Sequence, residues 1–182
     1  MKKNQMSDNM VSDRSILTGM FEDKESLEHA YNILRERGYS KNDINLIMTD
    51  ETRRKYFPVD VKETEIGTKA AEGAGKGSAI GGTIGAIAAI VAAVGTSFVI
   101  PGLGVVIAGP IAAGLAGAGA GAITGGLIGT LIGAGIPEER AKLYESGIKK
   151  GHIVMGVHPR NEEDAEYIEK SWYTNKGQKI YR

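Results

Sequence analysis

The feature that most constrains the fold of this chain is a long glycine-rich stretch without ionisable side chains. From Gly77 to Pro137 there is no Asp, Glu, Lys, Arg or His. Residues 67–135 contain 20 of the 26 glycines in the 182-residue chain. Charged residues therefore lie on both sides of an apolar segment. This segregation predicts an insertion that differs physically from the rest of the chain.

Two runs of this stretch have a glycine every four residues. The nine glycines are Gly73, Gly77, Gly81 and Gly85 in the first run, and Gly117, Gly121, Gly125, Gly129 and Gly133 in the second. Four residues are slightly more than one helical turn, so each run would form a stripe without side chains along a helix. Such a stripe lets another helix approach closely. We therefore predict that these glycines are helix-packing residues.

The two runs predict a Gly/Ala-rich helical hairpin over residues 67–136. Its apolar tip would be Thr96–Pro110, where Pro101, Pro110 and several glycines interrupt a helix. Each arm can reach about 20 residues, the length that crosses a bilayer core. The main prediction is a hairpin in contact with membrane lipid that also packs on other copies. The alternatives are a hairpin buried in the core of a soluble homo-oligomer and a flexible Gly/Ala segment.

The flanking segments have the patterns of two strand–helix–strand units. Residues 15–21 are apolar and β-prone, Asp23 can cap a helix over the residues that follow, and residues 43–49 form a second strand. After the insertion, Pro137 opens a linking helix, residues 152–158 form a strand, and a helix and an edge strand follow. Two βαβ halves make a ferredoxin-like split unit. The predicted class is therefore α+β, a ferredoxin-like domain with a long inserted hairpin.

The expected organisation has five parts. They are a disordered tail at 1–14, the first βαβ half at 15–50, a charged connector at 51–66, the glycine-zipper hairpin at 67–136, and the linking helix with the second βαβ half at 137–182. If both halves share one sheet, the two ends of the hairpin emerge on the same side of the membrane. Basic residues flank both ends, namely Lys69, Lys76, Arg140 and Lys142. This distribution favours an α+β domain in the cytoplasm under the positive-inside tendency.

No pattern of catalytic or cofactor-binding residues emerges from the sequence. The net charge of +0 provides no basic excess for nucleic acid, and the chain has no cysteine. Glu72–Ser78 fails the phosphate-loop pattern at Ala70 and Gly77. His152 and His158 share a strand face but lie roughly 20 Å apart, too far for one metal ion. We therefore predict a non-enzymatic protein without catalytic residues, cofactor or metal.

Several residues outside the insertion resemble a known family. Residues 16–50 resemble the first βαβ unit of the bacterial general stress protein 17M-like and heat-induced stress protein family. The matching positions are Phe21-Glu22-Asp23, Ala30, Leu34, Arg37-Gly38-Tyr39 and Asp43-Ile44. Residues 136–157 are similar to the segment that follows the glycine-rich hairpin in that family, with Pro137, Ala141, Tyr144 and Gly151 at the matching positions.

The resemblance implies stress-linked expression and no established catalytic residue. Together these features predict a stress-associated protein that is tethered to a membrane by the glycine-zipper hairpin, which also mediates self-association. A soluble homo-oligomer and a ligand-sensing ferredoxin-like module are the alternatives. The last of these rests on analogy between folds.

Overall fold

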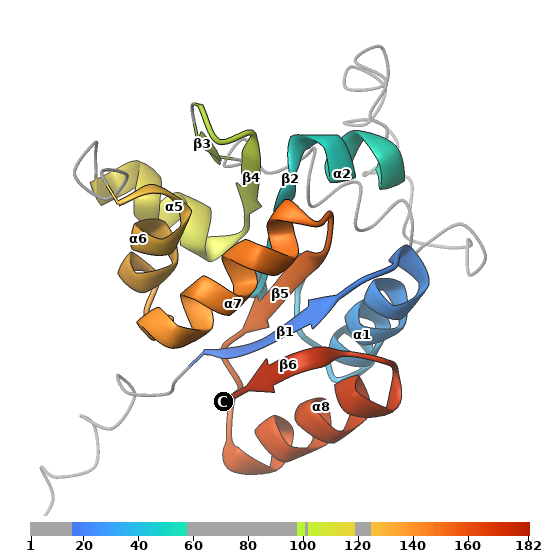
Figure 1. Cartoon of the computed structure of the whole chain (residues 1–182). Helices are drawn as coiled ribbons and strands as arrows, with labels where there is room; N and C mark the ends of the chain where they lie inside the picture. The colour runs from blue at the N-terminus through green and yellow to red at the C-terminus, as the bar shows by residue number, and fades with distance from the viewer. Residues whose placement is uncertain (1–15, 58–97, 101, 119–124) are drawn as a thin grey trace, which may run out of the picture.

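The computed structural model describes residues 16–57, 98–100, 102–118 and 125–182 (Figure 1). The strands are β1 (Leu17–Phe21), β2 (Ile44–Thr49), β3 (Phe98–Ile100), β4 (Val105–Ala108), β5 (Ile153–Val157) and β6 (Gln178–Tyr181). The α-helices are α1 (Lys24–Glu36), α2 (Asp50–Tyr56), α5 (Pro110–Ala118), α6 (Gly126–Gly133), α7 (Glu138–Lys149) and α8 (Glu162–Thr174). A short 3₁₀ helix, Lys41–Asp43, precedes β2. The predicted tail, residues 1–14, lies outside the described residues.

The six strands form one sheet in the order β3-β4-β2-β5-β1-β6, and every paired neighbour is antiparallel. This architecture confirms the predicted α+β class. Two strand–helix–strand units, β1-α1-β2 and β5-α8-β6, supply four of the strands. Because β5 lies between β2 and β1, the two units interleave in the middle of the sheet.

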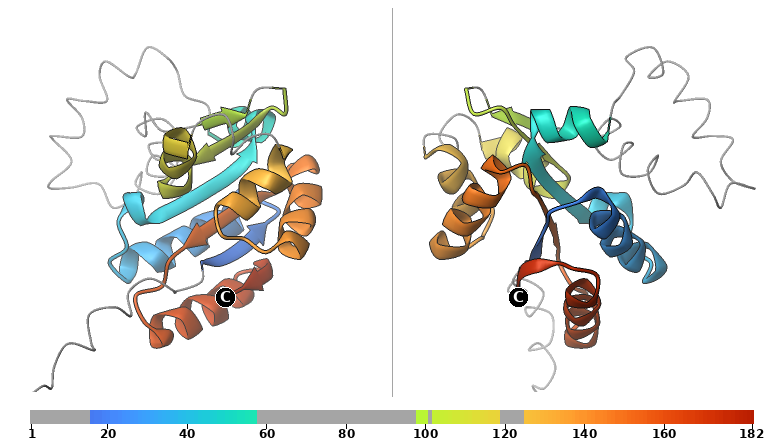
Figure 2. Two further views of the ribbon diagram at one scale, coloured as in Figure 1. Left: turned by 90° about the vertical axis from the view of Figure 1, so that its left-hand side faces the viewer. Right: turned by 45° about the vertical axis from the view of Figure 1, so that its right-hand side comes forward.

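Helices cover both faces of this sheet. α1 and α8 pack on one face, and α5, α6 and α7 pack on the other (Figure 2). In β1, Leu17 and Phe21 point to the first face, whereas Met20 packs beside Tyr144 and Ile148 of α7. All five residues of β1 are buried. The sheet is therefore the middle layer of three, and the alternation of side chains along its strands divides the core in two.

The predicted hairpin tip, an apolar break between two helical arms, instead supplies two strands, β3 and β4, that extend the sheet. β3 pairs with β4, and β4 pairs with β2 from Leu46↔Ala108 to Thr49↔Val105. Branched apolar residues favour strands, and the glycines between them turn the chain. Gly102 and Gly104 have φ angles of 83° and 59°, which glycine adopts without strain. Gly102 and Gly104 therefore lie in the turn between β3 and β4 instead of between two helical arms.

The predicted second arm is not one continuous helix. It is divided between α5 and α6, and Gly126 at the first position of α6 has a φ of 65°. A residue in this left-handed conformation does not fit inside a right-handed helix. Consequently Gly117 in α5 does not share a helical stripe with Gly129 and Gly133 in α6. Five further glycines of the predicted stripes lie outside the described residues: Gly73, Gly77, Gly81, Gly85 and Gly121.

The predicted membrane tether is contradicted. Within the ranges given above, no helix combines the length and the apolar character that crossing a bilayer requires. The apolar side of α6 is covered by the chain itself, since Leu127 and Leu131 are buried in the same core as Ile136 and Ala141. The expectation of a membrane-associated chain held by a transmembrane glycine zipper is therefore wrong for the part of the chain that the structure describes.

Candidate functional site

Three strand ends meet beside α2 at one end of the sheet (Figure 1). They are the C-terminal ends of β1 and β2 and the N-terminal end of β5, which follows the turn from α7. Between them lies a pocket of about 430 Å³, here called the α2 pocket. Its lining residues are Glu22, Thr49, Glu51, Thr52, Lys55, Tyr56, Lys149, Lys150, Gly151 and His152.

Hydrogen bonds hold α2 in place over this pocket. The Thr49 hydroxyl accepts from the Thr52 backbone N–H at 3.0 Å and donates to the Thr52 hydroxyl at 2.8 Å. The Thr52 hydroxyl in turn donates to the Gly151 carbonyl at 3.2 Å. The Asp50 N–H donates to the Gly104 carbonyl at 2.7 Å. α2 is thus bonded both to the turn before β5 and to the β3–β4 turn. The sequence had indicated only a flexible or partly helical connector here.

The charges of α2 differ between its two sides. Asp50 is paired with Arg53 and Arg54, and the hydrogen bond from Arg53 is the main cause that lowers the pKa of Asp50 below its ordinary value. Glu51 and Lys55 line the pocket one helical turn apart. Neither forms an ion pair with any residue in the described ranges. The side of α2 that faces the pocket therefore keeps one ammonium and one carboxylate unpaired.

The opposite wall carries cationic groups from the turn before β5. The Lys149 ammonium lies 3.2 Å from the Glu145 carboxylate, whereas Lys150 has no ion-pair partner in the part of the chain that the structure describes. The imidazole Nε2 of His152 lies 3.9 Å from the Glu22 carboxylate. The other nitrogen of His152, Nδ1, is buried and has no hydrogen-bond partner among the described residues. Cationic and polar groups thus face the pocket from two independent elements.

This arrangement is suited to binding a small polar molecule. A pocket of this size falls in the range of small-molecule sites in proteins, which bury their ligands with a few well-placed polar groups. Lysine ammonium groups donate to carboxylate or phosphate oxygens in charge-assisted hydrogen bonds. In the ranges that the structure covers, no three His, Asp or Glu side chains are placed to share a metal ion.

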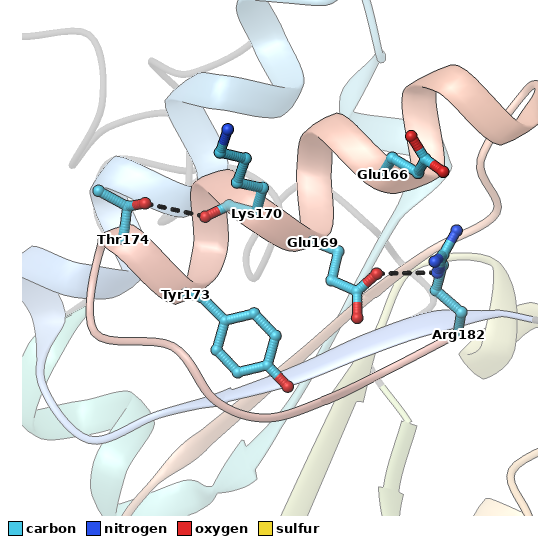
Figure 3. Close-up of a pocket in the computed structure, with 6 residues that line it drawn as sticks. All are labelled: Glu166, Glu169, Lys170, Tyr173, Thr174 and Arg182. Atoms are coloured by element: carbon cyan, nitrogen blue, oxygen red, sulfur yellow. Dashed lines mark hydrogen bonds and ion pairs between the residues drawn. The ribbon is translucent and has the colours of Figure 1, made fainter.

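A second hollow lies over α8 and the end of β6 (Figure 3). It has a volume of about 440 Å³ and is open to solvent. Arg182 Nε lies 2.8 Å from Glu169 and the Tyr173 hydroxyl donates to the Ile180 carbonyl, whereas Glu166 and Lys170 form no ion pair with any described residue. The Thr174 hydroxyl donates to a backbone carbonyl of the same helix. The α2 pocket is more enclosed and is lined by residues from several elements, so it is the better candidate.

The four predicted helix-packing glycines that the structure describes, Gly117, Gly125, Gly129 and Gly133, do not line the α2 pocket. A methyl group added at Gly129 or Gly133 would meet no atom within 4 Å, so the described chain makes no close contact there. A methyl group at Gly125 would lie 2.8 Å from the Gly129 Cα. Packing of these glycines against another chain stays a prediction.

The pocket residues were missed by sequence reasoning, which interpreted His152 as an ordinary histidine at a strand end. A usable signal was present in the Lys149-Lys150-Gly151-His152 turn. This turn joins a helix to a strand that the predicted βαβ pattern places in the centre of the sheet. Its side chains are therefore expected near the C-terminal end of the neighbouring strand, which ends at Thr49.

Comparison of the chain with protein-family models, with curated proteins and with solved structures finds no match. The resemblance to bacterial general stress proteins consequently stays a prediction. The functional interpretation of the α2 pocket rests on its geometry and its charges.

Proposed function

We propose that this chain is a non-enzymatic ligand-binding module that holds a small organic acid in the α2 pocket. The observation that carries the proposal is the pair of ammonium groups of Lys55 and Lys150. Both lysines line one pocket from different elements, and neither has a carboxylate partner among the described residues. A carboxylate ligand would accept from both groups and would bridge α2 to the turn before β5.

The arrangement of hydroxyls supports binding rather than catalysis. The Thr49 and Thr52 hydroxyl protons are donated to Thr52 Oγ1 and to the Gly151 carbonyl. A nucleophile needs a base within hydrogen-bond reach, and His152 faces Glu22 instead of a hydroxyl. The lining therefore offers groups that hold a ligand, without the pairing that activates a nucleophile.

We further infer that the fold is ferredoxin-like, extended at one edge of its sheet. The inference is supported by the order β6-β1-β5-β2 and by the two βαβ units that supply these strands. β4 and β3 continue the sheet beyond β2. The link to stress and the formation of a homo-oligomer stay predictions of the sequence.

Isothermal titration calorimetry of the full chain with acetate, succinate, citrate and L-aspartate tests the proposal. At least one of these acids is expected to bind with a saturable isotherm. Lys55→Gln and Lys150→Gln should each weaken that binding about tenfold, because each removes one charge-assisted hydrogen bond.

The matched control is Lys170→Gln, an exposed lysine at the α8 hollow, which should leave the affinity unchanged. Absence of saturable binding by all four acids would contradict the proposal. Equal affinities of the wild type and both pocket variants would contradict it as well.

A further inference from the structure

The α2 pocket contains unpaired groups of both signs. Glu51 has no ion-pair partner in the described ranges, and it lines the pocket together with Lys55. The Glu22 side chain is 52% exposed, and its carboxylate lies 3.9 Å from the imidazole Nε2 of His152. That separation exceeds the length of a hydrogen bond, about 2.7–3.2 Å between nitrogen and oxygen. Both carboxylates therefore retain their capacity to accept hydrogen bonds from a ligand.

These carboxylates restrict the charges that a ligand of the pocket can carry. A ligand with negative groups alone would satisfy Lys55 and Lys150 but would lie near Glu22 and Glu51, and like charges placed close together oppose binding. A ligand that also carries an ammonium group would donate to the carboxylates while its own carboxylate accepts from the lysines. The pocket is therefore complementary to a molecule that carries both charges.

Each of the two walls of the pocket carries one carboxylate and one ammonium group. α2 presents Glu51 with Lys55, and the wall formed by β1 and the turn before β5 presents Glu22 with Lys150. The ammonium of Lys55 lies 4.9 Å from the centre of the Tyr56 ring. Such a contact is weak at an exposed site, so this ammonium can turn toward a ligand carboxylate at small cost.

Resting on the proposed function, we infer that the ligand of the α2 pocket is a zwitterionic organic acid, an amino acid or a related acid that bears an amine. Its carboxylate is held by Lys55 and Lys150, and its ammonium group is held by Glu22 and Glu51. Neither wall alone provides both pairs, because each contributes one group to each pair. The ligand therefore spans α2 and the end of the sheet.

Calorimetric titration with L-aspartate and with succinate tests this inference, because the two acids share one carbon skeleton and differ by the amino group. The wild-type chain is expected to bind L-aspartate at least about tenfold more tightly than succinate, the gain of one charge-assisted pair. In the double variant Glu22→Gln/Glu51→Gln the ratio should fall below about threefold, because the amide oxygens carry no charge.

The control is the double variant Glu36→Gln/Glu163→Gln, which changes two exposed glutamates on α1 and α8 and should keep the wild-type ratio. Equal binding of the two acids by the wild type overturns the inference and leaves the proposed function standing. The same follows if citrate or acetate binds while L-aspartate does not, or if the Glu22→Gln/Glu51→Gln variant keeps the preference. If none of the four acids binds, the proposed function fails and the inference fails with it.

Discussion

At the scale of single residues, the buried Tyr144 hydroxyl joins α7 to two strands. It lies 2.7 Å from the Thr18 hydroxyl and 2.9 Å from the Lys179 carbonyl. Because a phenol has one proton and a carbonyl only accepts, Tyr144 donates to Lys179 and accepts from Thr18. Lys179 has a φ of 49° where the β1–β6 register shifts. The tyrosine thus satisfies a carbonyl at an irregular point of the edge strand.

Replacing Tyr144 by Phe should lower the free energy of unfolding by about 1–2 kcal/mol, because the Lys179 carbonyl loses its donor. Burial raises the pKa of the Tyr144 phenol above its ordinary value. As the pH rises beyond about 10, the unfolded chain loses this proton first, so the stabilisation by Tyr144 is complete below that pH and declines above it. Urea unfolding of both proteins between pH 7 and pH 11 should show the difference narrowing above about pH 10. A difference that does not change with pH would contradict this assignment.

Asp164 is a buried carboxylate that connects α8 to the end of α1. It is 6% exposed, accepts from the Arg37 guanidinium at 2.7 Å and accepts from the Tyr39 hydroxyl at 2.8 Å. Removing it leaves the Tyr39 hydroxyl without this acceptor. We expect Asp164→Ala to cost about 2–3 kcal/mol of unfolding free energy, as measured by urea denaturation. The exposed neighbour Glu163→Ala should cost less than about 0.5 kcal/mol, and equal losses would contradict a structural role of Asp164.

At the scale of elements, segments with one dominant pattern were predictable. Asp23 accepts from the Ser26 N–H at 2.7 Å, and the apolar face behind it forms α1 as expected. Residues 98–108 were not predictable, because branched apolar residues between glycines and prolines fit a hairpin tip and a strand pair equally. The pairing of β4 with β2, a strand more than fifty residues earlier in the chain, decides between these two structures. The α2 pocket was predictable only in part for a related reason: the turn before β5 could be placed near Thr49, but Glu22, Glu51 and Lys150 come together only through the sheet order.

Two glycines test the placement of β4 and α5 against β2. Gly109 has a φ of 101°, and a Cβ there would lie 2.3 Å from the Ile44 carbonyl oxygen. Gly114 lies in α5, where a Cβ would meet no atom within 4 Å. Thermal unfolding should show that Gly109→Ala is destabilised by at least about 2 kcal/mol, whereas Gly114→Ala is stabilised by about 0.5–1 kcal/mol through its higher helix propensity. Similar effects of both substitutions would show that this segment does not pack on β2.

At the scale of the whole molecule, the described part of the glycine-rich insertion, from β3 to α6, belongs to the core. β4 extends the sheet beside β2, and α5 and α6 cover the same face as α7. Asn45 of β2 accepts from the Ile111 N–H at 2.8 Å and so ties the start of α5 to the sheet. The chain thus uses a stretch without charges to complete a core that its two βαβ units leave open on one face.

This organisation predicts one cooperative unfolding transition. The only tryptophan, Trp172, is buried on the sheet face opposite to α6, so its fluorescence reports on the other core. Leu131→Ala in α6 should lower the free energy of unfolding, followed by Trp172 fluorescence, by about 2–4 kcal/mol, because Leu131 is fully buried. Ile132→Ala is the control, and it should change this free energy of unfolding little because the Ile132 side chain is 44% exposed. An unchanged Trp172 transition in Leu131→Ala would mean that the insertion unfolds independently.

The most direct test of ligand binding in the α2 pocket is a heteronuclear NMR titration of the full chain with L-aspartate. The amide signals of Glu51, Lys150 and His152 should move together along one saturable curve, because these residues line the pocket from both walls. The amides of Lys170 and Thr174 at the α8 hollow should stay in place. Signals that remain unchanged at the pocket, or that move only at the α8 hollow, would contradict the assignment of the α2 pocket as the binding site.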